Sequence, residues 1–324
     1  MSASESQSKG PRFAALDVLR GTALVAMALF HFTWDLDYFG LAPAGVTASA
    51  PFKWLGDGIA ASFLLVVGAS LALASRHGFA PRAFFRRLLT ITGAAALITL
   101  ATWYAFPDEF IFFGILHCIA LSSLAAAPFL RARLPIVLLV AAIALMLPIF
   151  IASPFLDAPQ YWWLGLGTHQ PLSNDWRPFL PWFGVVLIGL AGARAALAHG
   201  LPSRIADAHP KGIVGRGLIL AGRRSLLIYL VHQPLLFGAL FLATSLAGRP
   251  PPSDAASFAR NCSVQCTAQG ARARYCSRVC GCVATHTAPT PLWRHVLENR
   301  LSKPQRTQFN AIARECVGEV QKAK

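Results

Sequence analysis

Seven long apolar segments occupy most of the first 247 residues and limit what this chain can fold into. They cover residues 16–39, 58–75, 87–106, 111–130, 134–152, 179–198 and 223–247. The length of each is close to the roughly 20 residues that an apolar helix needs to cross the hydrocarbon core of a bilayer. Only 13% of the 324 residues are charged, whereas soluble domains average roughly a quarter. The sequence therefore predicts an all-α fold, a polytopic integral membrane helix bundle of about seven spans.

The basic residues predict the orientation of this bundle. Lys and Arg are frequent before the first segment, after the second and fourth, and between the sixth and seventh, whereas residues 40–57, 107–110 and 153–178 contain few. Because cytoplasmic loops carry the excess of Lys and Arg, we expect the N-terminus in the cytoplasm and the chain beyond residue 248 on the opposite side of the membrane. The short apolar segment 212–222 would reverse the side of the tail if it formed an eighth span. Basic loops with membrane lipids as their partner also explain the net charge of +15, so no nucleic-acid partner is expected.

Four regions are expected in chain order. Residues 1–12 are polar and form a cytoplasmic N-terminus, and residues 13–248 form the transmembrane domain. Residues 249–257 form a proline-rich linker, because proline cannot continue a helix. Residues 258–324 form a small cysteine-rich tail, in which we expect two helical pieces broken at Pro304.

The tail cysteines predict disulfides, with a metal site as the alternative. They are Cys262, Cys266, Cys276, Cys280, Cys282 and Cys316. The first four form two i,i+4 pairs, so two antiparallel helices would be joined by Cys262–Cys280 and Cys266–Cys276. That leaves Cys282 for Cys316, one of the fifteen pairings that six cysteines allow. Disulfides persist in the periplasm, whereas in a cytoplasmic tail the same cysteines with His286 and His295 would suggest zinc or an iron–sulfur cluster.

The first apolar segment carries more ionisable groups than a lipid-facing helix tolerates. At helical spacing Asp17, Arg20, His31 and Asp35 fall on one stripe, and His31 and Asp35 are one turn apart. Ionisable groups at membrane depth are costly and usually face a protein interior or a water-filled cavity. We therefore expect this stripe to line a functional site, with Asp17 and Arg20 paired near its cytoplasmic end.

Three histidines lie inside predicted spans and are candidates for proton transfer: His31, His117 and His232. Imidazole titrates near neutral pH, and Asp35 at i+4 would hold the tautomer of His31 and stabilise its imidazolium form. The alternative for each is a neutral histidine that hydrogen-bonds between helices. No metal is expected in the membrane, because each histidine stands alone on its span.

Aromatic residues crowd the connection 153–178, which contains the sequence YWWLGLGTHQPLSNDWRP. One interpretation is an aromatic belt at the membrane interface. The other is a lid or wall against which the apolar face of a sugar would stack.

Several motifs in this order resemble a known family. They are LDVLRGTALVAMALFHFTWDLDYFG, DGIAASFLLVVGASLAL, FGILHCIALSSL, PFLPWFGVVLIGL and GRRSLLIYLVHQP. They look like the short bacterial members of the heparan-α-glucosaminide N-acetyltransferase catalytic family, and the likeness covers about residues 12–245. The opening LRG and the closing SLLIYLVHQP also resemble the acyltransferase-three family, whose members have a functional histidine at the place of His31. In the lysosomal relatives the catalytic histidine lies in the outer loop after the first span, and this chain has no histidine between His31 and His77.

The resemblance implies a membrane enzyme that moves an acyl group, such as acetyl, from an acyl-CoA (acetyl-CoA) to a sugar or another amine or hydroxyl acceptor. His31, oriented by Asp35, would then be the general base or would take the acyl group itself, with His232 and His117 as further candidates. The CoA phosphates would bind to cytoplasmic arginines, for which the candidates are Arg76, Arg82, Arg86, Arg87, Arg223 and Arg224. The alternative is a non-enzymatic transporter or proton-coupled membrane protein that uses the same His and Asp groups as a relay.

Overall fold

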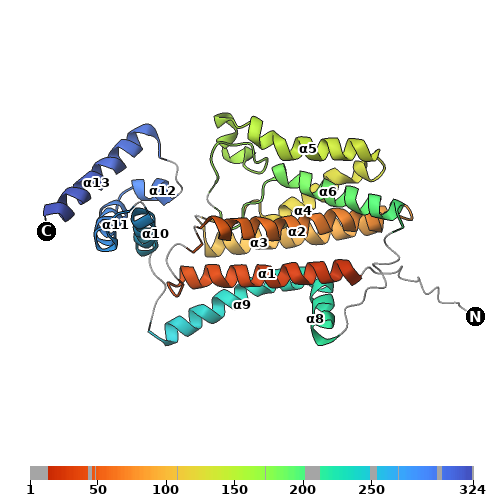
Figure 1. Cartoon of the computed structure of the whole chain (residues 1–324), viewed down its shortest axis with the longest axis horizontal. Helices are drawn as coiled ribbons and strands as arrows, with labels where there is room; N and C mark the ends of the chain where they lie inside the picture. The colour runs from red at the N-terminus through yellow and green to blue at the C-terminus, as the bar shows by residue number, and fades with distance from the viewer. Residues whose placement is uncertain are drawn as a thin grey trace, which may run out of the picture. The chain divides into compact units, whose positions relative to one another are not determined.

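The computed structural model describes residues 14–42, 46–47, 49–107, 109–171, 173–200, 212–248, 254–268, 270–297 and 301–322. Throughout these ranges the regular structure is helical, without a strand, which confirms the all-α prediction (Figure 1). The chain divides into two compact units. The first contains residues 1–27 and 58–230, and the second contains residues 28–57 and 231–324.

Within the described residues, five helices are long and apolar enough to cross a membrane. They are α1 (Ala14–Tyr38), α2 (Ala50–Ala74), α3 (Pro81–Ala105), α6 (Phe179–Ala198) and α9 (Ser225–Leu246). Two other predicted spans form shorter apolar helices, α4 (Ile115–Ala126) with the 3₁₀ turn η1 (Ala127–Leu130), and α5 (Leu134–Phe150). The protein is therefore an integral membrane protein by its helices, while the total of seven spans stays a prediction.

The helix bounds differ from the apolar segments where polar residues continue or stop a helix. The helix α2 begins at Ala50, eight residues before its apolar segment, because the amphipathic turn around Lys53 and Trp54 is also helical. The helix α4 begins after Gly114, so residues 111–114 precede it. The segment 212–222 forms a separate helix of 12 residues, α8 (Gly212–Arg223), which is too short to span a bilayer alone.

Small residues bring the helices of the first unit into close contact. A Cβ added to Gly68 of α2 would lie 1.9 Å from the carbonyl oxygen of Val186, and one added to Gly189 of α6 would lie 2.1 Å from that of Leu65. Backbone contact of this kind is a common basis of helix association in membranes. Around it, Leu64 and Leu187 are fully buried. The pair α2–α6 thus forms a rigid centre for the first unit.

Close backbone contact at glycine residues also joins α1 to α8. A Cβ on Gly21 would lie 2.2 Å from the carbonyl oxygen of Leu218, and one on Gly222 would lie 1.9 Å from that of Asp17. The close approach brings the end of α8 beside the first turns of α1. Arg223, the residue after Gly222, therefore lies beside Asp17, although it is more than 200 positions later in the sequence.

The second unit contains the later turns of α1, most of α9 and the tail helices. Phe237 of α9 packs against Tyr38 and Phe39 of α1, with ring centroids 5.4 and 5.1 Å apart. The tail forms α10 (Asp254–Ala268), α11 (Ala273–Thr287), α12 (Leu292–Leu297) and α13 (Lys303–Lys322). Arg260 of α10 donates a hydrogen bond of 3.1 Å to the carbonyl oxygen of Asp37 and so attaches the tail to the C-terminal end of α1.

Two expected boundaries in the tail need correction. Because α10 begins at Asp254, residues 254–257 are helical and do not belong to the linker. Pro304 lies in the first turn of α13, where proline is tolerated, so the helical pieces are interrupted before Pro304 rather than at it. The expected cytoplasmic N-terminus, residues 1–12, and the linker residues 249–253 lie outside the described residues.

Three disulfides join the tail helices. They are Cys262–Cys280, Cys266–Cys276 and Cys282–Cys316, the same pairs that the helical spacing favoured. The first two link α10 to α11 through buried Cys280 and Cys276, and the third links α11 to α13. A domain this small has a limited apolar core, so these bonds supply much of its stability.

Candidate functional site

His31 and His232 lie side by side in the second unit. Their ring centroids are 5.1 Å apart, and the ring planes are inclined by 58°. His31 belongs to α1 and His232 to α9, and both side chains are partly buried. The structure therefore brings together two of the three histidines that the sequence singled out.

Asp35 is completely buried one turn beyond His31. Its Oδ1 accepts a hydrogen bond of 2.7 Å from Nε2 of Gln233, the residue after His232. Its Oδ2 is buried and has no hydrogen-bond partner among the residues described. Gln233, which the sequence analysis does not single out, is thus a hydrogen-bond partner of Asp35, and the expected pairing of Asp35 with His31 stays a prediction. The only sequence signal for Gln233 was its place in the motif YLVHQP.

A carboxylate in this position is energetically unusual. A buried polar atom without a partner costs free energy, and a charged one costs more. Such groups are often retained at functional sites, so the buried Asp35, one turn from His31 on α1, is a candidate functional residue. Pro234 follows directly in α9, and a proline inside a helix removes a backbone hydrogen bond and allows the helix to bend at this level.

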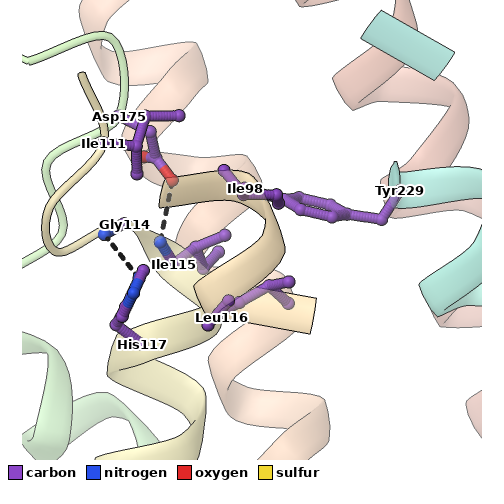
Figure 2. A pocket seen from close by; sticks show the side chains of 9 residues that line it. Ile98, Ile111, Gly114, Ile115, Leu116, His117, Asp175 and Tyr229 are labelled. Carbon is purple, nitrogen blue, oxygen red and sulfur yellow. Dashed lines mark hydrogen bonds between the residues drawn. The ribbon is translucent and has the colours of Figure 1, made fainter. Parts of the chain in front are cut away.

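His117 lies in the first unit, at the start of α4 (Figure 2). Its Nδ1 accepts a hydrogen bond of 3.2 Å from the backbone N–H of Gly114. Its Nε2 lies 3.2 Å from Oγ1 of Thr99, and that hydroxyl donates to the carbonyl oxygen of Ile111 at 2.7 Å. The hydroxyl proton is thus already committed, so Nε2 carries the ring proton and donates to Thr99. Both ring nitrogens are used by a neutral imidazole, which favours the packing interpretation of His117 over a catalytic one.

Asp175 completes the start of α4. Its Oδ2 accepts a hydrogen bond of 2.7 Å from the backbone N–H of Ile115, the first residue of the helix. Burial raises the pKa of Asp175, while the charge of Arg177 and the Ile115 amide oppose that rise. His117 and Asp175 thus satisfy the backbone donors that every helix leaves open at its N-terminus.

The pocket beside these residues is small. Ile98, Ile111, Leu116 and Tyr229 line it with His117 and Asp175, and its empty volume is about 140 Å³ (Figure 2). Ligand sites usually have roughly 300–1,000 Å³. We therefore assign this region to the packing of α4 and not to a substrate.

A basic cluster surrounds Asp17 in the first unit. Its Oδ1 lies 3.3 Å from Nη1 of Arg20, as expected, and its Oδ2 lies 3.3 Å from Nε of Arg223. Arg20 also donates a 2.5 Å hydrogen bond to Ser70, and Arg87 lies close enough to Arg20 for their charges to repel. Asp17 therefore pairs with two guanidinium groups, and with Arg87 near Arg20 the cluster has an excess of positive charge.

The other candidate arginines are placed differently. Arg82 and Arg86 of α3 and Arg224 after α8 are exposed, and Arg76 donates to Nε2 of the neighbouring His77 at 2.9 Å. Of the six arginines proposed for phosphate binding, Arg87 and Arg223 belong to the basic cluster. The sequence predicts Arg20 only as the ion-pair partner of Asp17.

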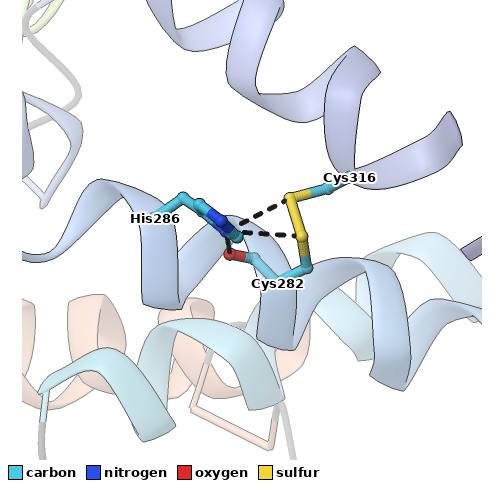
Figure 3. A group of neighbouring side chains, drawn as sticks. All are labelled: Cys282, His286 and Cys316. Carbon is cyan, nitrogen blue, oxygen red and sulfur yellow. Dashed lines mark hydrogen bonds between the residues drawn. A yellow bond between two sulfur atoms is a disulfide. The ribbon is translucent and has the colours of Figure 1, made fainter. Parts of the chain in front are cut away.

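In the tail, His286 lies against the disulfide Cys282–Cys316 (Figure 3). These three residues are the group of metal-binding side chains found within the described residues of the chain. His295, the second histidine considered for a metal, is not one of its members.

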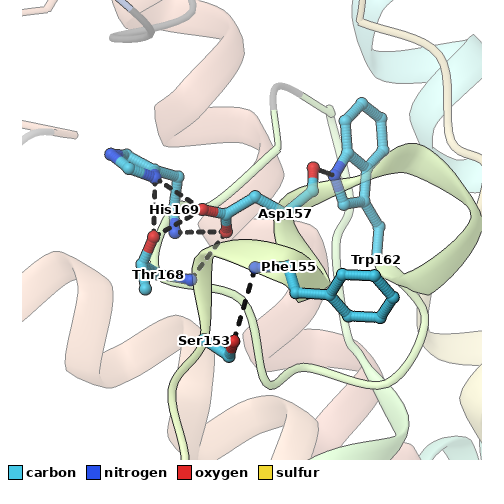
Figure 4. Close-up of polar contacts among 6 residues, drawn as sticks. All are labelled: Ser153, Phe155, Asp157, Trp162, Thr168 and His169. Carbon is cyan, nitrogen blue, oxygen red and sulfur yellow. Dashed lines mark hydrogen bonds and ion pairs between the residues drawn. The ribbon is translucent and has the colours of Figure 1, made fainter.

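The aromatic connection 153–178 is held by a hydrogen-bonded loop (Figure 4). Asp157 accepts hydrogen bonds from the backbone N–H groups of Thr168 at 2.6 Å and His169 at 3.1 Å, and Oγ1 of Thr168 also donates to it. Burial raises the pKa of Asp157, but these hydrogen bonds outweigh it and bring the pKa to about 2. The Nε1 of Trp162 donates to the carbonyl oxygen of Asp157 at 2.7 Å, so the aromatic residues sit on an ordered loop.

Comparison with known proteins identifies the membrane region of the chain. The sequence model of the family described as heparan-alpha-glucosaminide N-acetyltransferase, catalytic, matches residues 12–234. The match includes His31, Asp35, His232 and Gln233 and ends before the tail. The curated proteins and the solved structures gave no significant match to the chain. Because the match covers more than half of the 324 residues, the chain belongs to the heparan-alpha-glucosaminide N-acetyltransferase catalytic family.

Proposed function

We propose that this protein is an acyltransferase of the bacterial inner membrane that transfers an acetyl group from acetyl-CoA to an amine or hydroxyl of a sugar or similar small acceptor. The observation that carries the proposal is the polar group of α1 and α9, within the region that the family match covers: His31 beside His232, and Asp35 held by Gln233. A general base in an apolar surrounding is what acyl transfer requires.

The pair of imidazoles gives this site both an acid and a base. Two imidazolium ions with ring centroids 5.1 Å apart would repel each other, so the two rings would not both be charged at the same time. In the proposed reaction, neutral His31 removes the proton from the acceptor as it attacks the thioester carbonyl. The negative charge of Asp35, one turn away on α1, stabilises the imidazolium that forms, and the proton then leaves with the CoA thiol.

The basic cluster is the proposed binding site for the donor's phosphates. Asp17 pairs with Arg20 and Arg223, and Arg87 lies near Arg20, so three positive charges against one negative charge leave about two for an anion. Arginine binds phosphate well because its planar fork donates two parallel hydrogen bonds. This adds Arg20 to the residues proposed from the sequence and gives Arg87 priority over the exposed Arg82 and Arg86.

The test is transfer of labelled acetyl from acetyl-CoA in vesicles that contain the purified protein. A general base typically raises the rate of a reaction by 10²–10⁴-fold. His31→Ala should therefore lower the rate of acetyl transfer at least about 100-fold, while binding of acetyl-CoA should remain. His199→Ala, at the exposed end of α6, is the matched control and should keep full activity. Full transfer by a folded His31→Ala protein would refute the assignment of His31.

Donor binding is tested separately. Arg87→Gln should raise the KM for acetyl-CoA with a smaller effect on kcat, because it removes a phosphate contact that is equally strong before and during the reaction. Arg133→Gln, at the start of α5, is an exposed basic control. Substrate uptake without any acetyl transfer or acetyl-CoA hydrolysis would instead favour the transporter alternative.

A further inference from the structure

The third disulfide of the tail lies among side chains that bind metals. Cys282 and His286 are one turn apart on α11 (Figure 3). Cys316 and Glu319 are nearly one turn apart on α13. The Nδ1 of His286 lies 3.5 Å from Sγ of Cys282 and 3.9 Å from Sγ of Cys316. The Oε2 of Glu319 lies 3.4 Å from Sγ of Cys282. Two helices thus present two sulfurs, one imidazole nitrogen and one carboxylate oxygen at one place.

These separations match the edges of a zinc tetrahedron. With Zn–S of about 2.3 Å, Zn–N of about 2.1 Å and Zn–O of about 2.0 Å, tetrahedral angles place sulfur about 3.6 Å from nitrogen and about 3.5 Å from oxygen. The observed 3.5 and 3.9 Å to nitrogen and 3.4 Å to oxygen are close to these values. The two sulfurs need to move to a separation of about 3.8 Å, and reduction of their bond frees them to do so. The exposed side chain of Glu319 must turn as well, because it lies near Cys282 but outside the close group that His286 forms with the two cysteines.

We propose that Cys282, Cys316 and His286, with Glu319 as the fourth ligand, form a zinc site that is closed while the disulfide exists and is created when it is reduced. The proposal does not depend on the acyltransferase function, because the family match ends at residue 234, before the tail. It also connects the two expectations for these cysteines, since one group of residues serves as a disulfide in the oxidised tail and as a metal site in the reduced tail.

The chemistry balances in two steps. A dithiol reductant gives two electrons and two protons and becomes a disulfide, while the bond between Cys282 and Cys316 breaks and both become thiols. Zinc then binds the two thiolates and releases two protons to solvent. In the oxidised tail, Nδ1 of His286 also lies 2.9 Å from the carbonyl oxygen of Cys282 and donates its proton there. Zinc binding requires the other tautomer, in which Nε2 carries the proton and the Nδ1 lone pair faces the metal.

Access from solvent and the presence of further ligands favour this disulfide over the other two. His286 and Glu319 are exposed, so an ion can reach the group from solvent. The four remaining tail cysteines, by contrast, form no metal-type group with a nearby His or carboxylate within the residues that the structure describes. The proposed site therefore predicts one zinc ion per chain, bound at a specific pair of cysteines.

The experiment uses the full-length protein in detergent, reduced with a water-soluble phosphine that does not itself bind zinc. Zinc is added alone, and the free cysteines are then alkylated and located by mass spectrometry. We expect one zinc per reduced chain, with Cys282 and Cys316 protected from alkylation and the other tail cysteines modified. The oxidised protein should bind no zinc at the same free concentration.

Variants give an independent readout through Co²⁺, whose visible spectrum reports tetrahedral coordination and thiolate ligands. His286→Leu should weaken Co²⁺ and Zn²⁺ binding at least tenfold, Glu319→Gln should weaken it less, and Cys282→Ser should abolish the thiolate signal of the site. His295→Leu is the matched control and should leave both unchanged. The proposal is overturned if zinc protects Cys262, Cys266, Cys276 and Cys280 instead, if the reduced chain binds no zinc, or if His286→Leu binds as tightly as the natural chain.

Discussion

The hydrogen bond between Gln233 and Asp35 allows a sharp distinction between a functional and a structural carboxylate. In Gln233→Leu the donor is lost, and the buried Asp35 keeps neither of its oxygens satisfied among the described residues. Hydrogen bonds to charged groups contribute about 1.5–3 kcal/mol, so we expect a loss of stability of that size. At roughly 2–4 °C per kcal/mol, the unfolding midpoint should fall by about 3–12 °C.

Asp35→Asn should behave in the opposite way. The amide oxygen of Asn can still accept from Gln233, which retains a neutral hydrogen bond of about 1 kcal/mol. The change also replaces the unpartnered oxygen Oδ2 of a charged carboxylate by a neutral NH2 group, and burial of a neutral polar group costs less free energy than burial of a charged one. Stability should therefore stay the same or rise by about 1 kcal/mol, while acetyl transfer falls at least about tenfold because the imidazolium of His31 loses its counter-charge.

The assay is thermal unfolding of both variants and of the double variant in the same detergent, together with acetyl transfer in vesicles. In the double variant the leucine that replaces Gln233 faces no charge, so the cycle should give a coupling free energy of about 1–2 kcal/mol between the two positions. The reasoning is refuted if Gln233→Leu is as stable as the natural chain, or if Asp35→Asn is strongly destabilised yet fully active per folded molecule.

Two further predictions concern the first unit. His117→Leu should destabilise the protein by about 1–3 kcal/mol, because it leaves the N–H of Gly114 without an acceptor. His117→Gln should keep most of the stability, because its side chain can accept a hydrogen bond at the same helical position. Both folded variants should remain active. Asp157 has a pKa of about 2 in the folded chain, below the roughly 3.9 of an unfolded one, so its contribution to stability is complete above about pH 4 and is lost as the pH falls toward 2. Cleavage of the connection 153–178 by pepsin should therefore increase between pH 4 and pH 2, and Asp157→Asn should be cleaved readily at both pH values; equal protection of the two proteins at pH 4 would contradict this role.

The sequence by itself determined the features of the fold that depend on local composition. Five predicted spans appear as long apolar helices, because a continuous apolar run of about 20 residues has few alternatives to a helix in a membrane. The tail pairing follows from the same local logic, since an i,i+4 spacing places both thiols on one helical face. The polar stripe on α1 likewise follows from helical spacing alone, and it singles out His31 and Asp35.

Only the tertiary structure determined which residues contact the polar groups of α1. Gln233 follows Asp35 by 198 positions and Arg223 follows Asp17 by 206, and neither sequence neighbourhood names its partner. Lipid is as apolar as a leucine side chain, so the hydrophobic effect does not select which faces of two membrane helices pack together. That choice depends on close backbone contact at small residues such as Gly21 and Gly222, and on the few polar side chains that must find partners away from water. The structure therefore supplied the second imidazole, the amide that holds Asp35 and the third arginine of the basic cluster.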